Sequence, residues 1–129
     1  ELMGGMISHD RKPIPSVALT TDSSFLTAWS NDTDFESIFS RQVQGIGQSG
    51  DSLVGITTSG NSANVIAAVK QAKFKNIETI VFTGESGGMI KDLADITIFV
   101  PSDNTQRIQE AHIMIGQIIC GLIEESLLN

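Results

Sequence analysis

Residues 53–62 read Leu53-Val54-Gly55-Ile56-Thr57-Thr58-Ser59-Gly60-Asn61-Ser62, an apolar run followed by a polar turn. The apolar run is short and does not alternate strictly, which is typical of a strand covered on both faces in a parallel sheet. A helical pattern follows from Ala63 to Phe74, with apolar residues spaced to face inward. Strand, turn and helix in this order predict one β-α-β unit.

The same alternation continues on both sides of this stretch. The expected strands are residues 16–21, 53–57, 79–83 and 96–100, and the expected helices are residues 23–31, 34–44, 63–74, 89–94 and 105–127. On the second helix Phe35, Ile38, Phe39 and Val43 are expected to face inward. This order predicts an α/β fold, a doubly wound, flavodoxin-like parallel sheet with flanking helices. With no repeat and no linker, residues 1–129 are interpreted as one domain.

Composition narrows the function classes. The net charge is −7 and only eight basic residues occur, spread along the chain, so we expect no direct nucleic-acid partner. No apolar run approaches the roughly 20 residues that span a bilayer, so no membrane partner is expected. One cysteine, Cys120, excludes an intrachain disulfide and fits a reducing compartment, the cytoplasm. No signal peptide is visible. Because the chain starts with Glu1 and not with Met, we expect that an N-terminal segment is missing from it.

The turn after the strand has the composition of a phosphate site. Ligands of open α/β sheets collect where a strand ends and a helix begins, and a helix start offers free N–H groups to an anion. Hydroxyl groups come from Thr57, Thr58, Ser59 and Ser62, and Gly60 allows close backbone approach or a positive φ. A capped turn that binds nothing is the alternative, with Ser62 as the N-cap.

Several motifs in the same order resemble the sugar isomerase (SIS) domain family and, within it, the phosphoheptose isomerases. Besides Thr-Ser-Gly-Asn-Ser at 58–62, the similar segments are Ala18-Leu19-Thr20-Thr21-Asp22, Asn31-Asp32, Phe39-Ser40-Arg41-Gln42-Val43, Thr83-Gly84, Gly87-Gly88 and Arg107-Ile108-Gln109-Glu110-Ala111-His112. The resemblance covers nearly all 129 residues and implies a SIS domain that lacks its N-terminal helices and first strand here.

The resemblance also implies roles for individual residues. Thr57, Thr58, Ser59 and Ser62 would hold the substrate's phosphate, and Asp32 would contact sugar hydroxyls, with an Asx turn as the alternative for Asp32. Glu1 matches the family's catalytic base and zinc ligand, although on its own it reads as a terminal carboxylate. Gln109 matches a glutamine that contacts zinc and substrate.

Gln117 departs from the family pattern. The family usually has a histidine there, which binds metal and exchanges a proton, whereas an amide has no pKa near neutrality and is a poorer zinc ligand. The implied zinc, one per subunit, would be held by Glu1, Gln109 and Gln117. His112 is interpreted as a packing residue.

The implied activity is the interconversion of sedoheptulose 7-phosphate and D-glycero-D-manno-heptose 7-phosphate through an enediol, the first step toward the heptose of lipopolysaccharide. Glu1 would be the base, and Gln117 could at most orient or donate. Two alternatives stay open: a non-catalytic phosphosugar-binding protein, and a SIS protein that associates with the replication initiator. The last predicted helix is apolar around most of its girth, which predicts burial against another subunit, and the resemblance implies a homotetramer.

Overall fold

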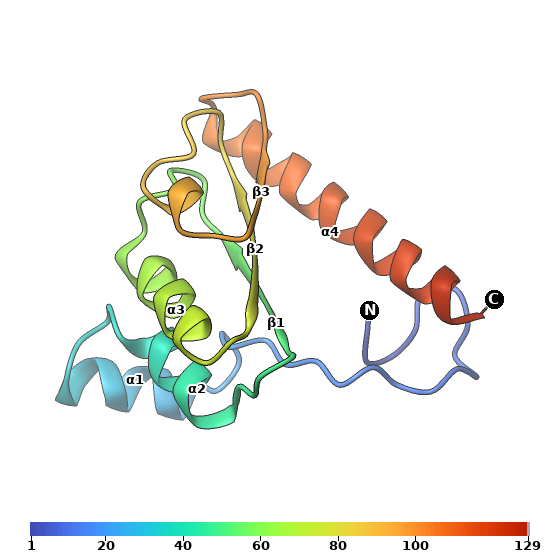
Figure 1. Cartoon of the computed structure of the whole chain (residues 1–129), viewed down its shortest axis with the longest axis horizontal. Coiled ribbons are helices and arrows are strands. Elements are labelled where there is room, and N and C mark those ends of the chain that lie inside the picture. Colours follow the sequence, from blue (N-terminus) through green and yellow to red (C-terminus); the bar gives the residue numbers. More distant parts are fainter. Residues whose placement is uncertain (129) are drawn as a thin grey trace.

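The computed structural model describes residues 1–128 and has a parallel sheet between two layers of helices (Figure 1). The sheet contains β1 (Ser52–Ile56), β2 (Glu78–Thr83) and β3 (Ile96–Phe99), in the order β1-β2-β3. Both strand pairs are parallel, with Val54 beside Ile80 and Ile80 beside Ile96. The predicted α/β class with a parallel sheet is therefore confirmed.

Helices cover the two faces unequally. On one face α3 (Ala63–Phe74) packs on β1 and β2, and α2 (Ile38–Ile46) packs on α3, with α1 (Ser23–Asp32) beyond it. The short 3₁₀ helix η1 (Ile90–Asp92) follows β2. On the other face, α4 (Thr105–Leu128) contacts β2 near its own start and then extends away from the sheet (Figure 1).

The core lies between the sheet and α3. One buried cluster joins Ile66 and Val69 of α3 to Val81 of β2 and to Ile90. A second cluster joins Val43 of α2 to the far end of α3. These contacts fix α3, and therefore the turn that precedes it, against the carboxyl edge of the sheet.

Two predicted elements are wrong at the N-terminal end. Residues 16–21 form no strand: they pair with none of the three strands, and Val17 is exposed. An extended segment without a hydrogen-bonding neighbour is not a strand. The helix expected over residues 34–44 begins only at Ile38, because Asp34 Oδ1 accepts the Ser37 N–H at 2.6 Å and closes a turn. Phe35, expected to face inward, is consequently 64% exposed, whereas Ile38 and Val43 are buried as predicted.

Helix α4 is the described segment that comes nearest to membrane-spanning length. This 24-residue helix is long and apolar enough to cross a membrane, judged by length and composition alone. Its charged residues lie in its first two turns and its last two, so the middle is apolar on average although no apolar run is continuous. Both of its ends contact the rest of the chain: His112 Nε2 lies 3.2 Å from the Thr83 carbonyl oxygen, and Glu124 binds the N-terminal segment.

Glu124 anchors residues 6–8 to the last turns of α4. Its side chain is buried and accepts backbone N–H groups from Met6, Ile7 and Ser8 at 2.7–3.0 Å, while Arg11 Nε lies 3.2 Å from Oε1. Burial by itself raises the pKa of this carboxyl, but the backbone donors of Ser8, Met6 and Ile7 and the Arg11 side chain outweigh it and lower the pKa to about 2. The N-terminal segment is therefore held at the far end of α4.

Candidate functional site

Two loops meet at the carboxyl edge of the sheet. The loop after β1 accepts hydrogen bonds from the loop after β2: Gly84 N–H donates to the Thr58 carbonyl at 3.0 Å, and Ile90 N–H to that of Gly60 at 3.1 Å. Asn61 adds a side-chain bond, because its Oδ1 accepts the Met89 N–H at 2.9 Å. The phosphate loop, defined here as residues 57–62, is therefore held by a neighbouring strand connection rather than by its own turn alone.

Glycine makes this loop contact possible. Gly60 has φ +67°, and a Cβ atom there would lie 2.1 Å from the Gly87 carbonyl oxygen. Across the contact, a Cβ on Gly88 would lie 2.5 Å from the Ser59 carbonyl oxygen. The backbone of the phosphate loop packs directly on the backbone of residues 87–88, so neither Gly60 nor Gly88 has room for a side chain. The two motifs Thr-Ser-Gly-Asn-Ser at 58–62 and Gly87-Gly88 are thus one structural unit.

The Ser62 hydroxyl does not cap α3. Ser62 occupies the N-cap position with an extended backbone, yet its side chain makes no capping hydrogen bond. Its Oγ instead lies 2.8 Å from Oγ1 of Thr57, which is buried at the end of β1. The position expected for Ser62 is confirmed, and the capping bond expected by the alternative interpretation is wrong.

Three backbone donors of the phosphate loop are also unused. None of the hydrogen bonds of residues 1–128 uses the backbone N–H of Thr58, Ser59 or Ser62. The Ser59 side chain is exposed and its Oγ accepts the Asn61 N–H at 3.1 Å, which leaves the hydroxyl proton available. Unused amides, a hydroxyl and the positive end of a helix are the donors that anion sites in proteins use.

A solvent-open hollow of about 360 Å³ borders the phosphate loop. It is lined by Phe35 and Glu36 from the α1–α2 connection and by Ser62, Ala63 and Asn64 at the start of α3. Sequence reasoning missed Phe35 and Glu36 as site residues, because the helical pattern placed Phe35 in the core. The available signal was Asp34, whose side chain closes the turn that delays the helix.

Asp32 lies on the same connection, at the last residue of α1. Its side chain is exposed, and Oδ1 accepts a hydrogen bond from Asn31 Nδ2 at 2.9 Å. The turn-forming role considered for it is taken by Asp34 instead. A carboxylate oxygen of Asp32 therefore remains free to accept a hydroxyl hydrogen bond.

Gln109 and Gln117 are both exposed on α4. Gln109 follows Ile108, whose side chain packs against Gly84 at the loop-bearing edge of the sheet. Gln117 lies eight residues, or about two turns, further along α4. The structure thus places the start of α4, with Gln109, beside the loops.

Glu1 lies at the opposite end of the molecule from the phosphate loop (Figure 1). Arg11 Nη2 donates to the Glu1 carbonyl at 3.1 Å while Arg11 also pairs with Glu124, so Glu1 lies near the end of α4. From His112 to Glu124 the helix rises about 18 Å. Within one chain, the expected base and the expected phosphate site are not brought together.

The residues expected to hold zinc do not form a zinc site in one chain. Glu1, Gln109 and Gln117 provide one carboxylate and two amides, whereas zinc sites are built from Cys, His and carboxylate ligands. Among residues 1–128, no three His, Cys, Asp or Glu side chains are grouped closely enough to bind a metal ion. The donor set therefore does not fit the metal.

His112 has a structural role. It is buried between α4 and β2, where its ring lies 6.0 Å from that of Phe82, so its interpretation as a packing residue is confirmed.

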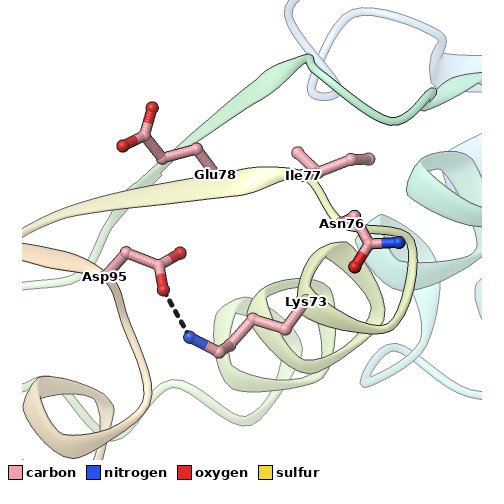
Figure 2. A pocket seen from close by; sticks show the side chains of 5 residues that line it. All are labelled: Lys73, Asn76, Ile77, Glu78 and Asp95. Atoms are coloured by element: carbon pink, nitrogen blue, oxygen red, sulfur yellow. Dashed lines mark hydrogen bonds and ion pairs between the residues drawn. The ribbon is translucent and has the colours of Figure 1, made fainter.

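A second hollow, lined by Lys73, Asn76, Ile77, Glu78 and Asp95, lies at the opposite edge of the sheet, where β2 begins (Figure 2). Its central charges, Lys73 and Asp95, are already paired.

Asp95 is the centre of that second hollow. The Lys73 ammonium donates to it, as do the N–H and hydroxyl of Thr79 at 2.9 and 2.6 Å. The Lys73 hydrogen bond, followed by those of Thr79, lowers the pKa of Asp95 to about 2. These contacts tie α3 to the β2–β3 connection, and they leave the carboxylate engaged rather than open to a ligand.

The parallel sheet with a hydroxyl-rich loop at its carboxyl edge defines an α/β domain of the doubly wound class, and comparison with known families narrows it. The SIS domain model matches residues 2–84, so the chain belongs to the SIS domain family.

Similarity to individual proteins points to a narrower group within the SIS domain family. The chain is 52% identical over 123 residues to phosphoheptose isomerase of Sulfurimonas denitrificans, covering 95% of this chain and 63% of that protein. It is 51% identical over 121 residues to phosphoheptose isomerase of Aquifex aeolicus, covering 94% and 63%. The chain therefore spans about three fifths of the length of these relatives.

Solved structures agree. The phosphoheptose isomerase of Francisella tularensis superposes with a TM-score of 0.91 at 38% identity, covering 95% of this chain and 66% of that one. The phosphoheptose isomerase of Neisseria gonorrhoeae superposes with a TM-score of 0.81 at 50% identity, covering 83% and 61%. The expected resemblance to phosphoheptose isomerases is confirmed.

Proposed function

We propose that this chain is the sugar-phosphate-binding part of a phosphoheptose isomerase, which interconverts sedoheptulose 7-phosphate and D-glycero-D-manno-heptose 7-phosphate. The observation that carries the proposal is the phosphate loop, where unused backbone N–H groups meet a serine hydroxyl that does not cap its helix. The similarity to proteins of that name at about 50% identity supports the choice of sugar. Such a reaction belongs to the synthesis of lipopolysaccharide heptose in the cytoplasm.

Binding the phosphate would position the substrate for chemistry at its other end. The isomerisation removes a proton alpha to the carbonyl, forms an enediol and returns a proton to the neighbouring carbon. Contacts to a distant phosphate lower the barrier by fixing the reacting carbons against the base. Hydroxyls of Thr58, Ser59 and Ser62 and the helix start would make these contacts, and buried Thr57 would support Ser62 from behind.

The base must come to this loop from elsewhere. Glu1 is far from the phosphate loop of its own chain, so we propose a homotetramer in which subunits complete one another's sites. The support is the exposed apolar surface of α4, where Met114, Ile118 and Leu122 recur every four residues. Zinc stays a prediction from the resemblance, and no step is derived through it because the donors do not fit.

Turnover depends on Gln117. Its amide cannot exchange a proton near neutral pH, which favours a second candidate function: a phosphosugar-binding SIS protein with no turnover. The test is incubation of the full chain with sedoheptulose 7-phosphate, with and without zinc, followed by separation of the two heptose phosphates.

Conversion that is lost in Ser59→Ala, and kept in the matched surface variant Ser49→Ala, supports the isomerase. Absence of conversion in the natural chain together with its appearance in Gln117→His supports the non-catalytic protein instead. If sedoheptulose 7-phosphate does not bind at all, both functions are excluded.

A further inference from the structure

The hollow beside the phosphate loop has a lining suited to a hydroxylated carbon chain. Phe35 presents an aromatic ring that is 64% exposed, and the carboxylate of Glu36 has no hydrogen-bond or ion-pair partner among residues 1–128. Asn64, at the start of α3, has an Nδ2 group that donates no hydrogen bond within the described chain. An apolar ring with a few unpaired polar groups is the usual composition of a small-molecule site.

The hollow borders the phosphate loop at Ser62, which belongs to both. A phosphate bound at the N–H groups of the helix start would therefore have its ester oxygen at the rim of the hollow. The carboxylate of Glu36 repels phosphate but accepts hydrogen bonds from hydroxyls. Charge thus orients the ligand, with the phosphate on the amides and the carbon chain toward Phe35 and Glu36.

We propose that Phe35 and Glu36 form a specificity subsite that binds the hydroxyl-bearing carbons next to the phosphate ester. The proposal rests on the proposed function and deepens it, since it names residues that distinguish a sugar phosphate from a bare phosphate. The Phe35 ring covers the C–H face of the chain, and Glu36 accepts one hydroxyl. A site built to bond a hydroxyl discriminates against ligands that lack it.

The test compares two probes, inorganic phosphate and sedoheptulose 7-phosphate, by titration calorimetry on the full chain. Phe35→Ala and Glu36→Gln are each expected to weaken sedoheptulose 7-phosphate binding by about five- to tenfold, the loss of one good contact. Phe35→Ala leaves inorganic phosphate unchanged, and Glu36→Gln does not weaken it, because a carboxylate can only repel that anion.

Controls separate this subsite from the phosphate loop. Ser59→Ala should weaken both probes, and Phe74→Ala, which removes an exposed ring at the far end of α3, should weaken neither. Both Phe35 and Phe74 are exposed, so unchanged thermal melting is expected for the two alanine variants. Backbone NMR signals of residues 35 and 36 should shift with sedoheptulose 7-phosphate and not with inorganic phosphate.

The outcomes separate the two proposals. If both probes bind and Phe35→Ala and Glu36→Gln affect neither, or weaken the two probes equally, the subsite is overturned while the phosphate site stands. If the unsubstituted chain binds neither probe, the proposed function is overturned and the subsite with it.

Discussion

Gly60 illustrates how a single residue controls the candidate site. Its backbone has a positive φ and packs against the carbonyl of Gly87, so any side chain meets both conformational and steric resistance. The residues around it carry the hydroxyls and N–H groups that would bind phosphate. Loop geometry and phosphate binding therefore depend on the same position.

Gly60→Ala should destabilise the protein by about 2 kcal/mol or more, since it combines left-handed strain with a backbone clash. The change is measured as the free energy of unfolding in urea. Gly45→Ala in α2 is the matched control: a methyl group there would meet no neighbouring segment within 4 Å, and we expect a gain of up to about 1 kcal/mol. Equal stability of the two variants would contradict the loop contact.

Glu124 gives the chain a defined response to acid. The folded protein keeps this carboxyl ionised down to a pKa of about 2, below the ordinary value of 4.5. Its contribution to stability is therefore complete above pH 4.5 and is lost as the pH falls from there toward 2. Hydrogen-exchange protection of Met6, Ile7 and Ser8 should decline over this range.

Glu124→Gln should remove that protection at every pH, because the amide cannot replace a charged acceptor of three backbone N–H groups. Glu110→Gln, on the same helix but exposed, should keep it. Protection of residues 6–8 that survives in Glu124→Gln would show that the segment is held by other contacts.

At the scale of elements, the decisive feature is the start of α3. The Oγ of Ser62, the expected N-cap, pairs with Oγ1 of Thr57 and makes no capping bond, and the backbone N–H of Ser62 is unused among residues 1–128. A helix normally gains about 1 kcal/mol from a side-chain cap. A helix start without a side-chain cap is less stable than a capped one. Proteins often accept this loss of stability where a functional site needs the free N–H donors.

Ser62→Asp tests this directly. Aspartate is a strong N-cap and suits the positive end of the helix, so we expect the free energy of unfolding to rise by about 0.5–1 kcal/mol. Phosphate binding should be lost, because a carboxylate occupies and repels the anion site. Ser49→Asp, away from any helix start, should change neither quantity; retained phosphate affinity in Ser62→Asp would place the anion elsewhere.

At the scale of the whole molecule, two apolar surfaces are exposed to water. One is formed by Val54, Ile56 and Ile96 on the sheet face opposite α3, and the other by Met114, Ile118 and Leu122 on α4. Exposed apolar surfaces of this kind are characteristic of subunit interfaces. They are the basis for the proposed assembly.

Leu122→Glu should shift the proposed assembly toward monomers, as measured by light scattering at micromolar concentration. Leu122 is exposed in the single chain, so its fold should be unaffected, which circular dichroism can verify. Phe74→Glu, equally exposed but on α3, should leave the mass unchanged. A monomeric natural chain under the same conditions would exclude the assembly.

The amino-acid sequence by itself determined the local pattern of this protein. The helix predicted over residues 63–74 and observed as Ala63–Phe74, the strands after it, and the hydroxyl-rich turn before it all follow from periodicity and turn chemistry within a few neighbouring residues. The family resemblance rested on the same short motifs.

Tertiary structure decided what depends on residues far apart in the chain. Packing of Gly60 on Gly87, the exposure of Phe35 beside α3, the missing strand at 16–21 and the separation of Glu1 from the phosphate loop are all set by contacts between distant segments. Local propensity does not encode such contacts, because a strand needs a neighbour and a site needs residues from several elements.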